Sequence, residues 1–496
     1  MNATPVDESS LPAFWWTAPV LALVVFLLAF PQAAMLPLLD RDEPRFAEAS
    51  REMLETGNYV VPTFNFAPRY AKPPLIYWCQ STAYRVLGEN ALAARLPSLI
   101  AVALTAVLLL AWGRALGSHA AGLIAALAYA LCLQVMQQGR VATADALLIF
   151  FMTLTGYAGW RMLRIAREED WGGPWYLWGL ALTIGFGGGF LAKGPEALLP
   201  FLPLMISARG LGAKVLGAFT AILALGLLLV ALWAVPAYVQ THGDYWREGL
   251  GHDVGDRMVT GFQGHGASTF GWYLLGLPLY LLTFWLSALP WSPLLAMRAR
   301  ALRDAAPLDW TDRYLLGNAL LVFVVFSLMV TKLPHYTLPA FPFLTLLFGR
   351  RWIAADLSPR TPLRLLIVVG LVMGIVVGVY GHFCGPCGVT PSPAGMLVQR
   401  AGAFLTPDTQ VALVDFREPN GVWELRRVVT APLEEISEDA EINYLLKPGP
   451  RAILLTHDAW ARIQMQASWE IFECRGFNAA RLKKLDLVLV IKPVNR

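Results

Sequence analysis

Long apolar stretches recur along the chain and restrict the folds that it can adopt. A helix needs ~20 apolar residues to cross a hydrocarbon core that is about 30 Å thick. Hydrophobic residues make up 56% of the sequence and charged residues only 15%, whereas about a quarter of a typical soluble domain is charged. Apolar stretches lie near residues 14–35, 91–113, 119–136, 145–160, 175–192, 195–208, 215–238, 270–296, 314–331, 336–349 and 363–383. We therefore predict a mainly α, polytopic membrane protein with about 11–13 transmembrane helices, some of them short or broken.

Net charge and cysteine content argue against two other kinds of protein. A formal charge of +4 is too small to indicate a nucleic-acid partner, and five scattered cysteines do not make a disulfide framework. The segment CGPC (384–387) has the spacing of a thioredoxin-type redox motif. Because it directly follows an apolar stretch and precedes the turn-like GVTPSPAG, a structural disulfide or free thiols fit better than redox catalysis.

The placement of basic residues predicts how the chain crosses the membrane, since cytoplasmic loops are enriched in Lys and Arg. With a cytoplasmic N-terminus, the inner side receives Arg114 and the segments 161–170, 208–214, 297–304 and 349–365, all of which are basic or carry arginine clusters. The N-terminal MNATPVDESS has no basic residue and no obvious cleavage site, so we expect the first span to be retained.

The opposite side collects the loops in which acidic and basic residues are mixed. These are the segments 36–90, 137–146, 192–196, 239–269 and 331–336, together with everything after 383. One topology thus satisfies the charge rule and also gathers the polar motifs at one face of the membrane.

The residues after 383 differ in character from the rest. Short β-like runs (QVALVDF, RRVVT, RAILLT and LDLVLVIK) alternate with helix-compatible segments such as LEEISEDAEINYLL. We predict a transmembrane domain over 1–383 and a soluble α/β domain over 384–496 on the outer side.

The first outer loop carries the densest group of charges. We expect a helix that starts near Pro44 and ends at Gly57, lies along the membrane interface, and has Asp42 and Glu43 at its N-terminal end. Carboxylates are favoured there by the helix dipole. An interfacial helix with satisfied ion pairs is the plainer interpretation of the same residues.

Four further outer segments bring charge to the same level of the membrane. A lysine fixed beside two prolines, as in RYAKPPLIYW, could bind a phosphate or only extend its ammonium to the interface. Asp145, at the start of an apolar stretch, could be a helix cap or a functional carboxylate. The remaining candidates are Tyr70, Lys72, Arg140, Lys332, His335, Tyr336 and, in 239–269, Glu248, His252, Asp253, Asp256, Arg257 and His265.

Six motifs together resemble one known family. DRDEPRFAEASREMLETGNYVVP, RYAKPPLIYW, ARLPS, RVATADALLIFF, FLAKGP and TKLPHYTLPAFP follow one another between residues 14 and 350. They resemble the ArnT-like polyprenyl-phosphate-sugar glycosyltransferases, relatives of the protein O-mannosyltransferases with a GT-C fold. The resemblance implies a bacterial inner-membrane enzyme, a sugar donor on undecaprenyl phosphate, cleavage of the C1–phosphate bond with inversion, and a periplasmic C-terminal domain.

The resemblance also implies roles for particular residues. Asp42 matches the carboxylate at the reaction centre, with Glu43 and Arg45 beside it, and Asp145 matches the second acidic position. The donor phosphate is implied to be bound by Lys72, Tyr336, Arg257, Tyr70, Arg45 and Lys332. Members often have an acidic residue just before the lysine of RYAK, where this chain has Ala71, so a divalent metal stays an open alternative and no ligand is assigned.

The acceptor and the mechanism leave alternatives open. Fixed cations and hydroxyl groups in a dry cavity would stabilise a departing lipid phosphate. An alcohol acceptor would need a base such as Asp42, whereas a lipid A phosphate is already anionic and would leave Asp42 to orient the sugar or balance its developing charge. Aminoarabinose and lipid A are the favoured pair, and protein O-glycosylation or modification of another surface glycan comes next. A secondary transporter is disfavoured because the charges gather at one face and no internal repeat is evident.

Overall fold

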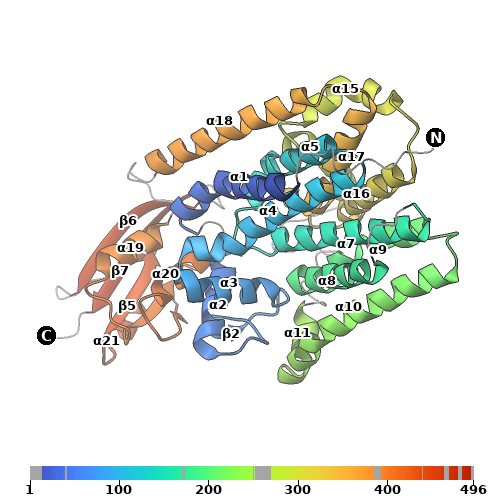
Figure 1. Cartoon of the computed structure of the whole chain (residues 1–496). Coiled ribbons are helices and arrows are strands. Elements are labelled where there is room, and N and C mark those ends of the chain that lie inside the picture. The colour runs from blue at the N-terminus through green and yellow to red at the C-terminus, as the bar shows by residue number, and fades with distance from the viewer. Residues whose placement is uncertain are drawn as a thin grey trace. The chain divides into compact units, whose positions relative to one another are not determined.

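The computed structural model describes residues 14–38, 42–169, 174–249, 251, 270–384, 392–437, 440–462, 469–478 and 483–492. The described residues form two compact units, whose residues can be followed by colour in Figure 1. A helical unit contains Met1–Phe30, Tyr70–Ile76 and Pro97–Ile375, and a sheet unit contains Pro31–Arg69, Tyr77–Leu96 and Val376–Arg496. Most of the first outer loop therefore groups with the C-terminal region, whereas Tyr70–Ile76 belongs to the helical unit.

Apolar helices dominate the helical unit. In chain order the helices with residues in it are α1 (Phe14–Met35), α3 (Leu75–Leu87), α4 (Ala91–Ala115), α5 (His119–Ala130), α6 (Leu133–Gln138), α7 (Asp145–Ala166), α8 (Trp175–Lys193), η2 (Pro195–Leu198), α9 (Phe201–Ser207), α10 (Ala213–Gln240), α11 (Asp244–Trp246), α13 (Phe270–Gly276), α14 (Leu279–Ser287), α15 (Ser292–Asp304), α16 (Trp310–Leu328), η4 (Pro334–Ala340), α17 (Phe341–Ala354) and α18 (Arg360–Cys384). Helices suit this composition because a backbone in lipid must satisfy its own hydrogen bonds.

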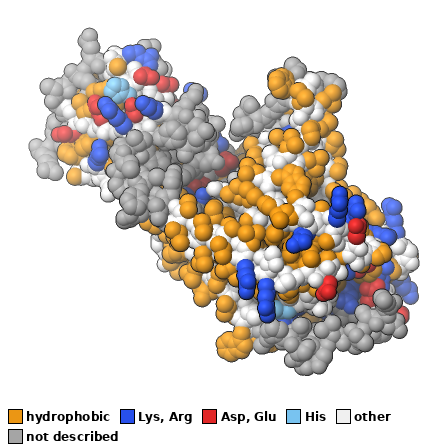
Figure 2. Space-filling model, turned by 90° about the horizontal axis from the view of Figure 1, so that it is seen from above, with side chains coloured by type: hydrophobic (Ala, Val, Ile, Leu, Met, Phe, Trp, Pro, Cys, Tyr) orange, Lys and Arg blue, Asp and Glu red, His pale blue; other side chains and the backbone are white. Residues whose placement is uncertain are grey.

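Each predicted apolar stretch contains helix in the described part of the chain, but several are broken. By length and composition, six described helices could cross a membrane, or seven if the pair Gly271–Ser287 and Ser292–Asp304, bent by 103°, counts as one span. The stretches 119–136, 195–208 and 336–349 each divide into two shorter helices, whereas α18 is continuous. Hydrophobic side chains cover a wide part of the surface seen in Figure 2, as expected of a lipid-facing surface.

Glycine allows α7 and α8 to pack closely. A Cβ at Gly185 of α8 would lie 2.6 Å from Oγ1 and 2.9 Å from the backbone nitrogen of Thr155 in α7. Small residues are common where membrane helices touch, because they let the backbones approach. This contact fixes the N-terminal residue of α7, Asp145, relative to the C-terminal residue of α8, Lys193.

The sheet unit is built on a five-stranded sheet of order β4-β3-β5-β7-β6, of which Figure 1 labels β5, β6 and β7. β3 pairs in parallel with β4 and β5, while β7 is antiparallel to both β5 and β6. One apolar cluster joins one face of the sheet to α19 and α20, and a second joins the other face to α21 and α22. The elements are β3 (Gln410–Val414), β4 (Glu434–Glu435), β5 (Arg451–Thr456), β6 (Glu470–Asn478), β7 (Lys483–Lys492), α19 (Pro393–Ala401), α20 (Pro419–Arg426), α21 (Glu441–Leu446) and α22 (His457–Trp460).

The α/β character of the C-terminal residues is confirmed, but one predicted strand is wrong. QVALVDF, RAILLT and LDLVLVIK contain β3, β5 and most of β7. RRVVT instead ends α20 and turns, because the Arg426 guanidinium donates to the carbonyls of Val429 and Ala431 and folds the backbone back. Strands β4 and β6 were not predicted from the sequence.

The helix predicted in the first outer loop is present as α2 (Asp42–Thr56), followed by a hairpin of β1 (Thr63–Phe64) and β2 (Ala67–Pro68). The left-handed backbone of Gly57 (φ +70°) ends α2, as its sequence indicates. Most of the helix is buried, including Glu43, Glu48 and Glu52. The charged side chains of α2 therefore form ion pairs inside the protein. A helix that only lay along the membrane interface would not need to bury them.

Candidate active site

A buried ion pair joins the ends of two membrane helices in the helical unit. Lys193 Nζ lies 2.8 Å from Asp145 Oδ1 and 3.2 Å from Glu196 Oε2, and Thr143 donates its hydroxyl to Asp145 Oδ2 at 2.9 Å. The side chains of Lys193 and Asp145 are only 7% and 14% exposed. Each stands at the helix end where its charge is favoured by the helix dipole. Because the two opposite charges are buried together and make further hydrogen bonds, the Lys193 ammonium is held in position in a site that excludes most water.

Tyr336 and His335 of η4 complete this cluster. The Lys193 ammonium lies 5.4 Å from the centroid of the buried Tyr336 ring, which packs against Phe326 and His335. Tyr280 donates to the carbonyl of Leu333 at 3.1 Å and so ties the start of this segment to α14. Asp145 and Tyr336, both predicted site residues, therefore meet at Lys193.

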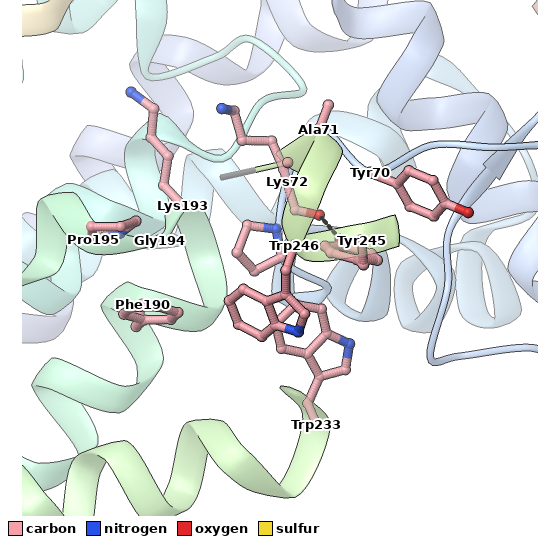
Figure 3. A pocket seen from close by; sticks show the side chains of 12 residues that line it. Tyr70, Ala71, Lys72, Phe190, Lys193, Gly194, Pro195, Trp233, Tyr245 and Trp246 are labelled. Atoms are coloured by element: carbon pink, nitrogen blue, oxygen red, sulfur yellow. Dashed lines mark hydrogen bonds between the residues drawn. The ribbon is translucent and has the colours of Figure 1, made fainter. Parts of the chain in front are cut away.

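Lys72 and Lys193 line one pocket of the helical unit (Figure 3). The pocket is small, with a cavity volume of about 30 Å³, which is room for only one or two water molecules. Figure 3 shows both lysine side chains extending in the same direction, with Phe190 and Trp233 elsewhere on the wall. Its lining residues are Tyr70, Ala71, Lys72, Pro73, Phe190, Lys193, Gly194, Pro195, Trp233, Tyr245, Trp246 and Gly249. Such a pocket offers two ammonium groups to an anion and aromatic walls to an apolar chain.

The loop that carries Tyr70 and Lys72 is held by the segment after α10. Tyr245 donates its hydroxyl to the Lys72 carbonyl at 2.5 Å (Figure 3), and its ring lies 5.2 Å from the ring of Tyr70. Burial, Asp244 and Glu248 raise the pKa of Tyr70 above its ordinary value. Its phenol therefore stays neutral and can donate a hydrogen bond at physiological pH.

The predicted carboxylates of the first outer loop have different surroundings within the sheet unit. Glu43 is buried and accepts from Arg95 Nε and Nη2 at 2.7 Å each. Arg95 also donates to the carbonyls of residues 33, 36 and 37, so the pair anchors the entry to α2. Asp42, the first residue of α2, keeps a side chain that is 59% exposed and lies 3.7 Å from Arg45 Nη1. Of the two carboxylates, Asp42 is the accessible one.

Two other predicted site residues, Lys332 and Arg257, are not among the described residues that line the pocket. Lys332 donates to the carbonyls of Ser327 and Met329 and lies over the ring of Tyr273, so it caps the C-terminal end of α16 and is absent from the pocket lining. Burial lowers the pKa of Lys332. Arg257 lies outside the described residues, as do His252, Asp253, Asp256, His265 and the second cysteine of CGPC.

Lys193 and Arg95 were not among the predicted site residues. Lys193 belongs to the motif FLAKGP and Arg95 to the motif ARLPS, both part of the family resemblance. A charged residue near the end of an apolar helix is the sequence signal that could have identified them. Within the described residues, no group of three or more His, Cys, Asp and Glu side chains is arranged to bind a metal.

Comparisons with known proteins agree on a family. A family model described as dolichyl-phosphate-mannose-protein mannosyltransferase matches residues 14–209. The undecaprenyl phosphate-alpha-4-amino-4-deoxy-L-arabinose arabinosyl transferase of Edwardsiella ictaluri is 31% identical over 68% of this chain and 59% of its own length. The enzyme of that name from Yersinia enterocolitica is 30% identical over 72% of this chain and 63% of its own. The matched region thus spans about three fifths of these curated relatives.

A solved structure shows the same architecture. The crystal structure of ArnT from Cupriavidus metallidurans bound to undecaprenyl phosphate superposes with a TM-score of 0.75, covering 97% of this chain and 98% of that chain at 18% identity. The chain is therefore a multi-pass helical membrane protein with the GT-C fold. Together with the sequence matches, this shows that it belongs to the ArnT-like family of polyprenyl-phosphate-sugar-dependent glycosyltransferases.

Proposed function

We propose that this protein is a glycosyltransferase of the bacterial inner membrane that moves a sugar from an undecaprenyl-phosphate-linked donor to an acceptor at the periplasmic face. The favoured pair is 4-amino-4-deoxy-L-arabinose and a lipid A phosphate, because the curated relatives carry the corresponding name. The single observation that carries the proposal is the pocket in which Lys72 and Lys193 meet aromatic walls.

The pocket matches a phosphate attached to an apolar chain. Two ammonium groups would bind the phosphate oxygens, and Asp145 would fix the position of Lys193 through their ion pair. Phe190, Trp233 and Trp246 would contact the first isoprene units. We assign the neutral phenol of Tyr70 and the hydroxyl of Tyr336 as further hydrogen-bond donors to the donor phosphate.

The chemical step needs little covalent help from the protein. The bond between C1 of the sugar and the phosphate oxygen breaks, and the electron pair leaves with the lipid phosphate. Lysine charges held in a site of low dielectric stabilise that oxygen in the transition state. The acceptor oxygen forms a bond to the opposite face of C1, which inverts the configuration. Asp42 accepts the proton of an alcohol acceptor, or orients the sugar when the acceptor is a phosphate.

The proposal includes a topology and a division of labour. The N-terminus is cytoplasmic, residues 1–383 form the catalytic transmembrane domain, and residues 384–496 form a periplasmic α/β domain. The basic segments 161–170 and 297–304 would then lie in the cytoplasm, as the charge rule requires.

Mass spectrometry of lipid A from cells with and without the gene tests the substrate pair. We expect an added pentosamine only when the gene is present. With the purified full-length protein, Asp42→Asn and Lys72→Ala should each lower transfer from undecaprenyl-phosphate aminoarabinose by at least about a hundredfold. Lys214→Ala, which removes an exposed lysine at the start of α10, is the matched control and should retain activity. Wild-type turnover by Lys72→Ala would refute the assignment of the pocket.

Transfer of a sugar to a protein is the second candidate, because the mannosyltransferase family model matches residues 14–209. An unchanged lipid A spectrum, with glycopeptides or a surface glycan that depend on the gene, would favour this activity. The same pocket would then bind a different lipid-linked sugar.

A further inference from the structure

Arg426, the last residue of α20, is a fully buried arginine that reaches α2. Its side chain has no exposed surface, and its Nη2 lies 3.0 Å from Glu55 Oε2, while its Nε lies 3.7 Å from Glu48 Oε1. Its Nη1 donates to the carbonyl of Val429 at 2.8 Å, and the guanidinium lies 4.6 Å from the ring centroid of Phe66. The C-terminal region thus places a cation against the acidic face of α2.

A second arginine shares the same two carboxylates from within α2. Arg51 contacts both oxygens of Glu48, at 2.7 and 3.0 Å, and Glu55 Oε2 at 2.8 Å. Two arginines, one on α2 and one on α20, therefore bracket Glu48 and Glu55. Glu48, Arg51 and Arg426 are buried, whereas Glu55 is 36% exposed. Removing one of the buried charges leaves another without compensation, so the pairing favours one position of α2 against α20.

Two further links join the C-terminal region to the residues on either side of α2. Asn420 in the first turn of α20 donates to the carbonyl of Leu38 at 2.9 Å, four residues before Asp42. After α2, Asn65 donates to the Leu433 carbonyl and accepts from the Leu433 amide, both at 2.8 Å. We call Asn420, Arg426 and Leu433 the clamp.

We infer that the clamp is a positioning device that sets the location of Asp42, so that the C-terminal domain contributes to transfer without touching the reacting groups. The inference rests on the proposed function. Asp42 is the first residue of α2 and its side chain is 59% exposed, so its position follows the orientation of the helix. The clamp holds the chain before, along and after that helix. A displacement of about 1 Å at a catalytic group can cost on the order of a hundredfold in rate.

The test compares full-length variants reconstituted in lipid. Arg426→Ala and Asn420→Ala remove clamp contacts, and Arg426→Lys keeps the charge but loses the planar fork. Arg427→Ala is the matched control, because Arg427, the residue after α20, is 42% exposed, pairs with Glu424 of that helix, and packs on Trp423. The measurements are amide hydrogen exchange of residues 42–56, kcat and KM for the lipid-linked donor, and thermal unfolding.

We expect Arg426→Ala and Asn420→Ala to increase exchange over 42–56 and to lower kcat by about tenfold to a hundredfold. The donor KM should change less than about threefold, since the lysine pocket is intact. Arg426→Lys should recover part of the loss, and Arg427→Ala should match the wild type. A merely structural role would lower the unfolding temperature without this separation of kcat from KM.

Unaltered exchange over 42–56 together with wild-type kcat in Arg426→Ala would overturn the inference, as would equal losses in Arg427→Ala. If Arg426→Ala does not fold, Asn420→Ala decides the question, because it loses only the hydrogen bonds to the Leu38 carbonyl and from the Ser392 hydroxyl. If the wild-type protein transfers none of the tested sugars, the proposed function fails. The difference in exchange between Arg426→Ala and Arg427→Ala then still decides whether the clamp positions α2.

Discussion

At the scale of single residues, the ion pair of Asp145 and Lys193 has two separable roles. Each charge is nearly buried, so each makes the burial of the other tolerable. The ammonium of Lys193 also lines the pocket, whereas Asp145 is absent from the pocket lining. Stability should therefore depend on having both charges or neither, and phosphate binding should depend on the lysine alone.

Lys193→Met should leave Asp145 as an uncompensated buried charge and destabilise the protein by about 3–5 kcal/mol. The double variant Lys193→Met with Asp145→Asn should recover most of that stability but none of the transfer activity. Thermal unfolding in detergent and a transfer assay on both variants check this prediction. Recovery of activity in the double variant would show that the lysine charge is dispensable.

Residue identity alone does not show which groups a predicted site residue meets, because those partners lie far apart in the sequence. Glu43 and Asp42 are neighbours in the sequence, yet only Glu43 meets Arg95, which lies 52 positions away. Lys332 is predicted to bind the donor phosphate, and in the structure its ammonium donates to the carbonyls of Ser327 and Met329 at the end of α16. Lys193 shows its role only when α7 brings Asp145 against it.

At the scale of elements, the segment after α10 positions the loop that carries Lys72. The Tyr245 hydroxyl binds the backbone of that loop, and Gly249 approaches it from the same segment. A Cβ at Gly249 would lie 2.5 Å from the Tyr70 carbonyl oxygen, a distance that forces the backbone to move. The loop and the segment after α10 thus form one unit of the pocket.

Gly249→Ala should displace the loop and raise the donor KM by about tenfold, because the lysine ammonium moves away from the phosphate. Gly217→Ala is a suitable control, since a Cβ at Gly217 in α10 would meet no atom within 4 Å. Steady-state kinetics with varied donor concentration distinguish the two variants. A normal KM in Gly249→Ala would mean that Tyr70 and Lys72 tolerate the shift.

Elements with strong local signals were predicted and those fixed by tertiary contacts were not. The glycine after α2 and the apolar run of β5 are visible in the sequence. β6 carries charged residues along an edge of the sheet, as in EIFECRGFN, and its strand structure comes from pairing with β7. RRVVT has strand composition, but hydrogen bonds from Arg426 override it.

At the scale of the whole molecule, the fold persists while the sequence diverges. The Cupriavidus metallidurans structure matches at 18% identity over nearly the full length of both chains. Apolar composition and the short motifs predicted the helical membrane architecture, since spans need only suitable length and hydrophobicity. The grouping of most of the first outer loop with the C-terminal region was not predicted, because it depends on contacts such as Asn65 with Leu433, 368 positions apart.

The orientation in the membrane is the prediction that connects the whole molecule to its substrate. Helix α15 exposes three arginines, as expected of a cytoplasmic segment: Arg298, Arg300 and Arg303. An alkaline phosphatase reporter fused after residue 496 should be active, because this enzyme folds only in the periplasm, and fusions at residues 209 and 304 should be inactive. A fluorescent protein that requires the cytoplasm should give the reverse pattern. An active phosphatase at 304 with an inactive one at 496 would place Lys72 and Lys193 on the cytoplasmic side, where a periplasmic acceptor could not reach them.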